Sequence, residues 1–406
     1  MKRNNRYTLT ILFLTLFMTM VGFGVIMPIL PYYAENLGAS ATELGLLSAT
    51  YATLQFFFAP VWGRVSDKVG RKPILLLGLF GFSVSFVIFG LSTRLWMLFA
   101  ARAVSGIISA ATLPTVMAYI ADSTDEKERA GGMSTLGAAM GLGMIFGPVI
   151  GGFLGEYNPS TPFFFSAAVA LGVAVFGLIF LPETLSEEAR QAAMQSRKAG
   201  GGIAGIFIAL RGPLAYLMLL ALLVSFGMSQ MESTAALFYE RKFGAGEAEM
   251  GIIFMVMGVV SAGSQGVFVG RVINRWGEQR AIMAGLLGTA LSFLIFPLIF
   301  SVTSAIGVII IMGVVTSFLR PALNSLISKR TNFSEQGMIL GVVNSYFSLG
   351  RMFGPVTGGL IFDYLGLDWP YLVASFIHFL AFGLSFIFLA VKAPQKPLLV
   401  VNTPAE

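Results

Sequence analysis

An internal repeat at a constant offset limits what this chain can fold into more than any other feature. The segment Gly143–Gly152 reads GMIFGPVIGG, and 207 residues later the segment Gly350–Gly359 reads GRMFGPVTGG. The same offset places identical residues on one another elsewhere: Gly63 on Gly270, Arg64 on Arg271, Val65 on Val272, Gly70 on Gly277, Pro114 on Pro321 and Glu128 on Glu335. A register held this far indicates two halves with the same order of helices, as in membrane proteins built from parallel repeats.

The composition indicates that lipid is the solvent. Hydrophobic residues make up 56% of the chain and charged residues only 11%, against about 25% charged residues in a typical soluble domain. The 47 glycines fit membrane helices, which approach closely at small residues. With no Cys and a single His, the chain offers no thiolate nucleophile, disulfide or Cys metal site. We therefore expect a membrane protein without metal or cofactor, and not an enzyme.

Apolar runs of about 20 residues predict an all-α membrane protein with twelve spans in two six-helix halves. The spans are expected at 8–30, 43–62, 74–93, 95–120, 131–155, 162–182, 213–237, 248–269, 281–300, 302–327, 337–362 and 370–391. The N-terminal half is expected at 1–182, a cytoplasmic linker at 183–212, the C-terminal half at 213–391 and a cytoplasmic tail at 392–406.

The basic residues predict the orientation. With the N-terminus inside, 20 of the 26 Lys and Arg residues fall on the cytoplasmic side. Only Arg94, Arg241 and Lys242 fall outside. By the positive-inside rule both termini are cytoplasmic. The net charge of +6 is thereby a topology signal, and no nucleic-acid partner is expected.

The connection between the second and third spans, GRVSDKVGRKP at 63–73, has glycines suited to a tight reversal of the chain. An isolated basic loop would be equally well explained as a simple topogenic turn. The string resembles, however, the signature loop GxxxDxxGRK of the major facilitator superfamily, with every specified position filled. The resemblance implies a gating role for a set of residues at the cytoplasmic side: Gly63, Asp67, Gly70, Arg71, Lys72 and Arg129.

The resemblance extends over nearly the whole chain. The decapeptide at Gly143 is similar to the fifth-helix antiporter motif of the drug exporters in this superfamily. The residues so assigned are Gly143, Gly147, Pro148, Gly151 and Gly152, with Gly354 and Pro355 in the second copy. The segments 22–31 and 181–184 resemble the first-helix motif and the sixth-helix end of the twelve-helix drug/proton antiporters, and Arg102 matches their fourth-helix arginine. The best match is the branch of tetracycline-type and quinolone-type multidrug exporters.

Some positions depart from the family patterns. Where tetracycline exporters have acidic or His residues, this chain has Thr19, Ala262 and Gly288, so we do not expect tetracycline to be the main substrate. In the tenth helix the Asp of the pattern Asp-x-x-Arg-Pro is replaced by Ser317, although Arg320 is kept. In the second-half loop Asn274 replaces the Asp.

Glu232 is the one acidic residue that we place inside a predicted span. A carboxylate at the centre of a membrane helix costs about 2.5–3.5 kcal/mol on insertion scales, and removal from water disfavours its charged form. These properties suit a proton carrier. A shorter seventh helix would instead leave Glu232 merely extracellular.

Three arginines also fall within spans. Arg102 has no acidic residue in the interior of its own half, whereas Arg320 and Arg351 lie in the half that contains Glu232. A role for Arg102 in proton coupling follows if its hydration responds to protonation elsewhere. Bonds to carbonyl groups at helix breaks, or snorkelling to the interface, would explain the arginines structurally.

In the superfamily that the chain resembles, certain spans line a central cavity. The polar and charged residues of this sequence on those spans form our predicted substrate site: Tyr51, Gln55, Gln230, Glu232, Gln265, Arg320, Asn344 and Tyr346. An apolar cavity with few directional groups suits hydrophobic, often cationic drugs. The resemblance implies a monomeric antiporter in a bacterial cytoplasmic membrane, driven by the proton gradient. An exporter of a metabolite, sugar or lipid and a non-transporting sensor with the same fold are the alternatives.

Overall fold

The computed structural model describes residues 3–123, 126–188, 190–191, 214–331 and 336–389, and the regular structure within them is helical. The helices of the first half are α1 (Arg3–Asn36), α2 (Ala41–Val69), α3 (Arg71–Gly90), α4 (Leu95–Ser109), α5 (Thr112–Ser123), α6 (Glu126–Tyr157) and α7 (Thr161–Phe180). Those of the second half are α10 (Ala215–Phe243), α11 (Glu247–Ser264), η1 (Gln265–Val269), α12 (Gly270–Trp276), α13 (Glu278–Ile295), η2 (Phe296–Leu298), α14 (Val302–Thr316), α15 (Leu319–Lys329), α16 (Gln336–Leu365) and α17 (Trp369–Leu389).

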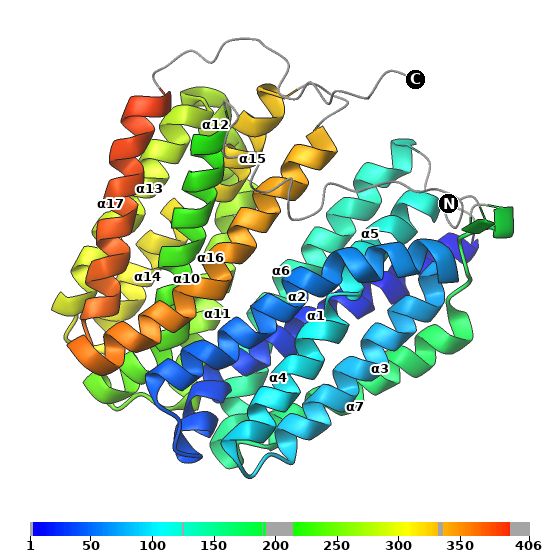
Figure 1. Cartoon of the computed structure of the whole chain (residues 1–406), viewed down its shortest axis with the longest axis horizontal. Helices are drawn as coiled ribbons and strands as arrows, with labels where there is room; N and C mark the ends of the chain where they lie inside the picture. Colours follow the sequence, from blue (N-terminus) through cyan, green and yellow to red (C-terminus); the bar gives the residue numbers. More distant parts are fainter. Residues whose placement is uncertain (1–2, 124–125, 189, 192–213, 332–335, 390–406) are drawn as a thin grey trace, which may run out of the picture.

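The two halves form two bundles that meet at one end and diverge at the other (Figure 1). We call the end where α1 finishes and α2 starts the closed end, and the end where α1 starts and α17 finishes the wide end. Buried apolar residues follow this division. Each half has a cluster of its own around the wide-end parts of its helices, while a third cluster combines residues of both halves, such as Val25, Phe163 and Tyr239. The halves therefore share one core only toward the closed end.

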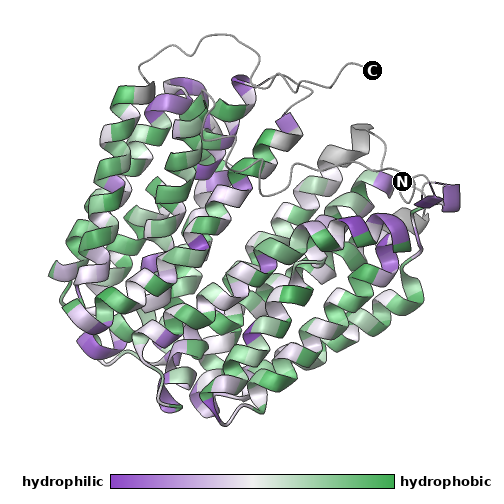
Figure 2. Cartoon of the chain, in the orientation of Figure 1, coloured by the Kyte–Doolittle hydropathy of each residue, from purple (hydrophilic) through white to green (hydrophobic). Residues whose placement is uncertain are grey.

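The helices have the length and polarity of membrane spans. In the described part of the chain, eleven helical segments are long and apolar enough to cross a membrane. The long helix α16 corresponds to the remaining predicted span and packs against α10 and α2. Hydrophobic residues dominate the middle of the bundles, and hydrophilic residues gather at the two ends (Figure 2). The predicted twelve-helix membrane fold is confirmed.

The repeat is visible in the positions of the helix breaks. The fourth span is interrupted between Ser109 and Thr112, and the tenth between Thr316 and Leu319, at the same 207-residue offset. Pro114 and Pro321 follow these breaks. Since proline has no N–H group, it cannot bond the carbonyl one helical turn earlier, which weakens the helix at that point.

The connection between α2 and α3 is shorter than expected. The motif was predicted as a loop, but Gly63–Val69 is helical, and Gly70 alone separates the two helices. Gly70 has a φ of 122°, and its counterpart Gly277 between α12 and α13 has a φ of 81°. Only glycine adopts such values readily, so each chain reversal is made by one residue.

Glycines of the two decapeptides bring helices into backbone contact. A side-chain carbon at Gly147 would lie 2.6 Å from the carbonyl oxygen of Val21 on α1, and one at Gly354 would lie 2.5 Å from that of Phe226 on α10. The last glycines of the two strings face the opposite half. Gly152 lies against Glu247 and Gly251 on α11, and Gly359 lies against Ala41 on α2. Each decapeptide therefore joins helices within its half and also joins the halves.

Two of the predicted segments lie largely or wholly outside the described residues. These are most of the linker at 183–212, beyond residue 191, and the tail at 392–406.

Candidate functional site

A cavity of about 100 Å³ lies between the two halves. Helices α1, α2 and α4 line it from the first half, and α10 and α16 from the second. Most of its wall is apolar, including Phe23, Met27 and Leu30. Of the predicted residues, Tyr51, Gln55, Arg102 and Glu232 line this cavity, together with Arg351 and Pro355. A mostly apolar space with a few convergent polar groups has the properties of a small-molecule site.

Arg102 is held by aromatic rings. Its side chain is buried, and the guanidinium carbon lies 5.5 Å from the ring centre of Tyr51 and 5.9 Å from that of Phe89. Such cation–π contacts stabilise a cation without neutralising it. The Nε of Arg102 has no hydrogen-bond partner in the described structure. The buried charge therefore remains uncompensated next to the cavity.

Tyr51 connects this arginine to neighbouring polar groups. Gln55 donates through Nε2 to the Tyr51 hydroxyl at 3.1 Å, and Ser109 donates through Oγ to the same oxygen at 3.0 Å. These two hydrogen bonds hold the Tyr51 side chain in place, one from α2 and the other from the end of α4. The Tyr51 ring is thereby positioned to contact both Arg102 and the cavity.

Glu232 lies in the interior of α10, which continues to Phe243. Its carboxyl group reaches the same cavity as Arg351 from α16, and the two attract each other electrostatically. The structure describes no ion pair between them. Glu232 can therefore exchange a proton or contact a cation without first breaking a close salt bridge.

The remaining predicted substrate residues lie elsewhere in the second half. Gln265 and Arg320 line a separate pocket, and Arg320 donates through Nη2 to Oδ1 of Asn344 at 2.9 Å. Gln230 is buried and donates through Nε2 to Thr357 at 3.1 Å. Tyr346 lies in the apolar cluster of the second half. The predicted substrate residues are therefore of three kinds: some line the central cavity, some line the separate pocket, and Gln230, Asn344 and Tyr346 line neither.

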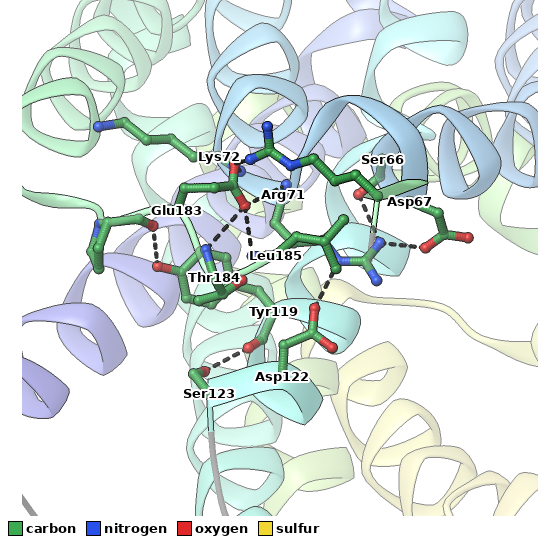
Figure 3. Close-up of polar contacts among 12 residues, drawn as sticks. Ser66, Asp67, Arg71, Lys72, Tyr119, Asp122, Ser123, Glu183, Thr184 and Leu185 are labelled. Atoms are coloured by element: carbon green, nitrogen blue, oxygen red, sulfur yellow. Dashed lines mark hydrogen bonds and ion pairs between the residues drawn. The ribbon is translucent and has the colours of Figure 1, made fainter. Parts of the chain in front are cut away.

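Three of the predicted gating residues, Asp67, Arg71 and Lys72, lie close together where α2 ends and α3 begins (Figure 3). Arg71 lies between two carboxylates, with its Nη1 2.6 Å from Asp67 and its Nε 2.9 Å from Asp122 on α5. Its Nη1 also donates to Ser66 at 3.0 Å. The Asp67 side chain remains 51% exposed, which leaves it accessible to a further partner. A side chain at Gly63 would meet open space, and the side chain of Arg129 is outside the described part.

Glu183 anchors this cluster, and the sequence analysis did not assign it a role. Its Oε1 accepts from the backbone N of Arg71 at 2.9 Å, and its Oε2 accepts from that of Lys72 at 3.2 Å. A carboxylate at this place stabilises the N-terminus of α3. The same carboxylate pairs with Arg190 at 3.3 Å. An acid after the end of a span and a turn with exposed N–H groups are both visible in the sequence, but their contact is not.

Hydrogen bonds join the halves at the closed end. Asp363 on α16 accepts from the backbone N of Ala41 at 3.2 Å and of Thr42 at 2.8 Å, where α2 begins. Arg241 on α10 pairs with Glu35 on α1 at 3.0 Å. The sequence analysis predicted none of these bonds, because their partners are far apart in the chain.

Comparison with known proteins identifies relatives along the whole chain. A family model described as Major Facilitator Superfamily matches residues 12–350 and 243–403. Multidrug resistance protein 2 of Bacillus subtilis (strain 168) is 32% identical over 385 residues, which cover 95% of this chain and 96% of that protein. The class D tetracycline resistance protein of Salmonella ordonez is 35% identical over 347 residues, 84% of this chain and 86% of the relative. A solved structure of a bacterial homologue of the human lysosomal transporter Spinster, in an inward-facing and occupied conformation, matches with a TM-score of 0.77 at 17% identity, covering 97% of this chain and 98% of the other.

Proposed function

The chain belongs to the Major Facilitator Superfamily, and from this premise we propose that it exports hydrophobic, often cationic drugs in exchange for protons. The observation that carries the proposal is a carboxyl group, Glu232, in a mostly apolar cavity between two halves that meet at one end only. The names of the relatives, multidrug and tetracycline resistance proteins, favour drugs over a metabolite, sugar or lipid as cargo.

The proposed orientation places the wide end in the cytoplasm. The basic residues of the described structure support it, because Arg64 and Lys68 lie near the end of α2, Arg271 and Arg275 lie in α12, and both of these helices reach that end. In this orientation the two halves diverge toward the cytoplasm and pack together toward the outside, an arrangement that would load a drug for export from the cytoplasm. The chain would then be a multi-pass protein of a bacterial cytoplasmic membrane with both termini inside.

The proposed cycle has two steps that alternate at Glu232. A drug entering from the wide end displaces the proton of Glu232, and reopening toward the other side allows the carboxyl group to be protonated again. Coupling requires that drug and proton bind the two conformations with different affinity. The cycle uses the proton gradient, no cofactor, and a single chain. Arg102, uncompensated next to the same cavity, would respond electrostatically to the charge of Glu232.

The test is ethidium efflux from energised vesicles containing the wild type, Glu232→Gln or Glu156→Gln. The last variant is the matched control, since Glu156 is exposed at the end of α6. We expect efflux that an uncoupler abolishes, that falls to background in Glu232→Gln and that persists in Glu156→Gln. Equal efflux by wild type and Glu232→Gln would remove Glu232 as the proton carrier. Absence of efflux for ethidium and for other cationic dyes would contradict the proposed function.

A further inference from the structure

Helices α2 and α16 belong to opposite halves and pack against each other where α2 starts, at the closed end. A side-chain carbon at Gly45 would overlap the carbonyl oxygen of Pro355, and one at Gly359 would overlap that of Ala41. We call these contacts the α2–α16 seam. Both helices also line the central cavity, α2 with Ser48 and α16 with Pro355. The seam must therefore separate if the cavity is to open at the closed end.

Asp363 extends the seam by one helical turn. It follows Gly359 by four residues on α16, which places the two on the same face of the helix. Its Oδ1 accepts from the backbone N of Ala41 at 3.2 Å, and its Oδ2 accepts from the backbone N of Thr42 at 2.8 Å and from the Thr42 hydroxyl at 2.6 Å. A carboxylate of one half therefore binds the N-terminus of a helix of the other half, where free N–H groups and the helix dipole favour a negative charge.

The first turn of α2 also has a cap within its own half. Oγ of Ser40 accepts from the backbone N of Glu43 at 3.2 Å, and Oε2 of Glu43 accepts from the backbone N of Ser40 at 2.8 Å. Such a capping box stabilises the start of a helix. Loss of the Asp363 bonds would therefore release the seam without unwinding α2, so these bonds can break and form again in a repeated motion.

The equivalent seam, between α6 and α11, has no counterpart of this cap. At the 207-residue offset, Asp363 corresponds to Glu156 and Thr42 to Glu249. Glu249 caps its own helix by accepting from the backbone N of Gly246 at 3.0 Å. In the described part of the chain no hydrogen bond joins Glu156 to α11. An acid at both positions disfavours a second cap of this kind, because like charges repel each other.

Other bonds between the halves at the closed end come from α1. Glu35 pairs with Arg241 on α10 at 3.0 Å, and the Tyr32 hydroxyl donates to the carbonyl oxygen of Ala245 at 2.8 Å. These bonds stay in place when Asp363 is replaced. Removal of the Asp363 carboxylate is therefore expected to raise the population that is open at this end, without fixing the protein in that conformation.

We propose that Asp363 is a positioning residue of the transport cycle, which holds α2 against α16 and thereby sets how readily the cavity opens at the closed end. The inference rests on the proposed function in one respect, because opening at this end is taken to be the step that releases the drug. Since the α6–α11 seam lacks such a cap, the parting of the halves is controlled at the α2–α16 seam.

A single thiol in the cavity tests the proposal. The chain has no Cys, so Ser48→Cys places one reactive group on the α2 wall of the cavity. Its reaction with the membrane-impermeant reagent sulfonatoethyl methanethiosulfonate is timed in right-side-out and inside-out vesicles. The full-length protein carries Ser48→Cys alone or together with Asp363→Ala, Asp363→Asn or Asp368→Asn. Asp368 is the matched control, since it precedes α17 at the same end but pairs with Lys242 of its own half at 3.1 Å.

One of the two vesicle orientations should react slowly with Ser48→Cys alone, and it exposes the closed end to the reagent. From that side Asp363→Ala should react about fivefold faster, the effect of removing a carboxylate from an exposed helix N-terminus. From the other side it should react no faster, because the added population is drawn from the conformation that is open at the wide end. Asp363→Asn, which keeps an acceptor without the charge, should fall in between. Asp368→Asn should stay within about twofold of the parent on both sides.

An unchanged rate from the slow side in Asp363→Ala would overturn the proposal. Faster reaction from both sides would overturn it too, because that result indicates a loosened structure and not a shifted balance between conformations. Equal acceleration in Asp368→Asn would reduce the effect to a general loss of charge. The reaction needs neither dye nor proton gradient, so absence of dye efflux would count against the proposed function and leave this result standing. Slow reaction in the right-side-out vesicles would in addition support the proposed orientation.

Discussion

At the start of α3 the first half places Arg71 against Asp122, whereas at the start of α13 the second half places Glu278 against Lys329. The positions are equivalent at the 207-residue offset, so the ion pair is present in both halves with its signs exchanged. Each half therefore has an ion pair that links two helices, α3 to α5 in the first half and α13 to α15 in the second. The halves differ in which helix carries the acid and which carries the base. The halves differ in the third member, because Asp67 joins the first pair and Asn274 stands in its place in the second.

The halves also differ within the membrane. Glu232, Arg320 and Arg351 of the second half correspond to Val25, Leu113 and Met144 of the first. The helix breaks and packing glycines are common to both halves, but these charged side chains are not. The comparison teaches that the repeat sets the scaffold and that the chemistry is found where the repeats have diverged.

The largest predicted effect concerns the two ion pairs whose signs are exchanged between the halves. Arg71 is buried between two acids, while the side chain of Lys329 is 66% exposed. Arg71→Ala should therefore lower the free energy of unfolding by about 2–3 kcal/mol, because removal of a buried cation leaves unpaired carboxylates. Lys329→Ala should cost less, about 1 kcal/mol, because the Lys329 ammonium is exposed and the largely buried Glu278 carboxylate keeps its hydrogen bond from Ser325 at 2.9 Å. Thermal unfolding of the purified variants measures both changes in stability. Equal losses of stability would show that the two ion pairs contribute equally, contrary to this prediction.

An intermediate effect is expected at the glycines that face the opposite half. A side-chain carbon at Gly152 or Gly359 would overlap backbone atoms of α11 or α2, and such overpacking costs about 1–3 kcal/mol. Gly152→Ala and Gly359→Ala should therefore both lower stability and slow transport. Gly172→Ala is the control, since nothing lies within 4 Å of the added carbon. Loss in only one of the two variants would mean that the halves do not contribute equally to the closed end.

The smallest predicted effect, on dye efflux, concerns Asp67 and its counterpart Asn274 in the second half. Asp67→Asn removes one charge from the Arg71 cluster, and a hydrogen bond of this kind is worth about 1–2 kcal/mol in the balance between two conformations. We expect dye efflux to fall severalfold with dye binding unchanged. Asn274→Asp should leave efflux within about twofold of the wild type, because Glu278 and not an arginine occupies the position equivalent to Arg71. Efflux at the wild-type rate in Asp67→Asn would contradict its role in gating.

Much of the fold could be predicted from the sequence, because hydrophobic runs, prolines and the repeat are local signals. The prediction that residues 63–73 form a loop was wrong for a physical reason. Helix α2 stays helical to Val69 even though Gly63 weakens it, since one glycine with positive φ suffices to reverse the chain.

Less of the candidate site than of the fold could be predicted from the sequence. Burial of Glu232 in a long helix was predictable because an acid in an apolar run is a local feature. The separation of Gln265 and Arg320 from the central cavity was not, and neither was the capping of α3 by Glu183 across more than a hundred residues. These contacts depend on which helix faces pack together, and a single sequence carries no direct record of that.

The decapeptide glycines have a consequence for how such an exporter can evolve. At the closed end the contacts of Gly152 and Gly359 are made with main-chain atoms of the opposite half. A main-chain contact survives when neighbouring side chains are exchanged, provided that the glycine itself is kept. Residues that line the pockets are therefore free to mutate one at a time while the surfaces that move against each other stay intact. A protein with this architecture can therefore change the compounds that it exports while the contacts between its two halves are kept.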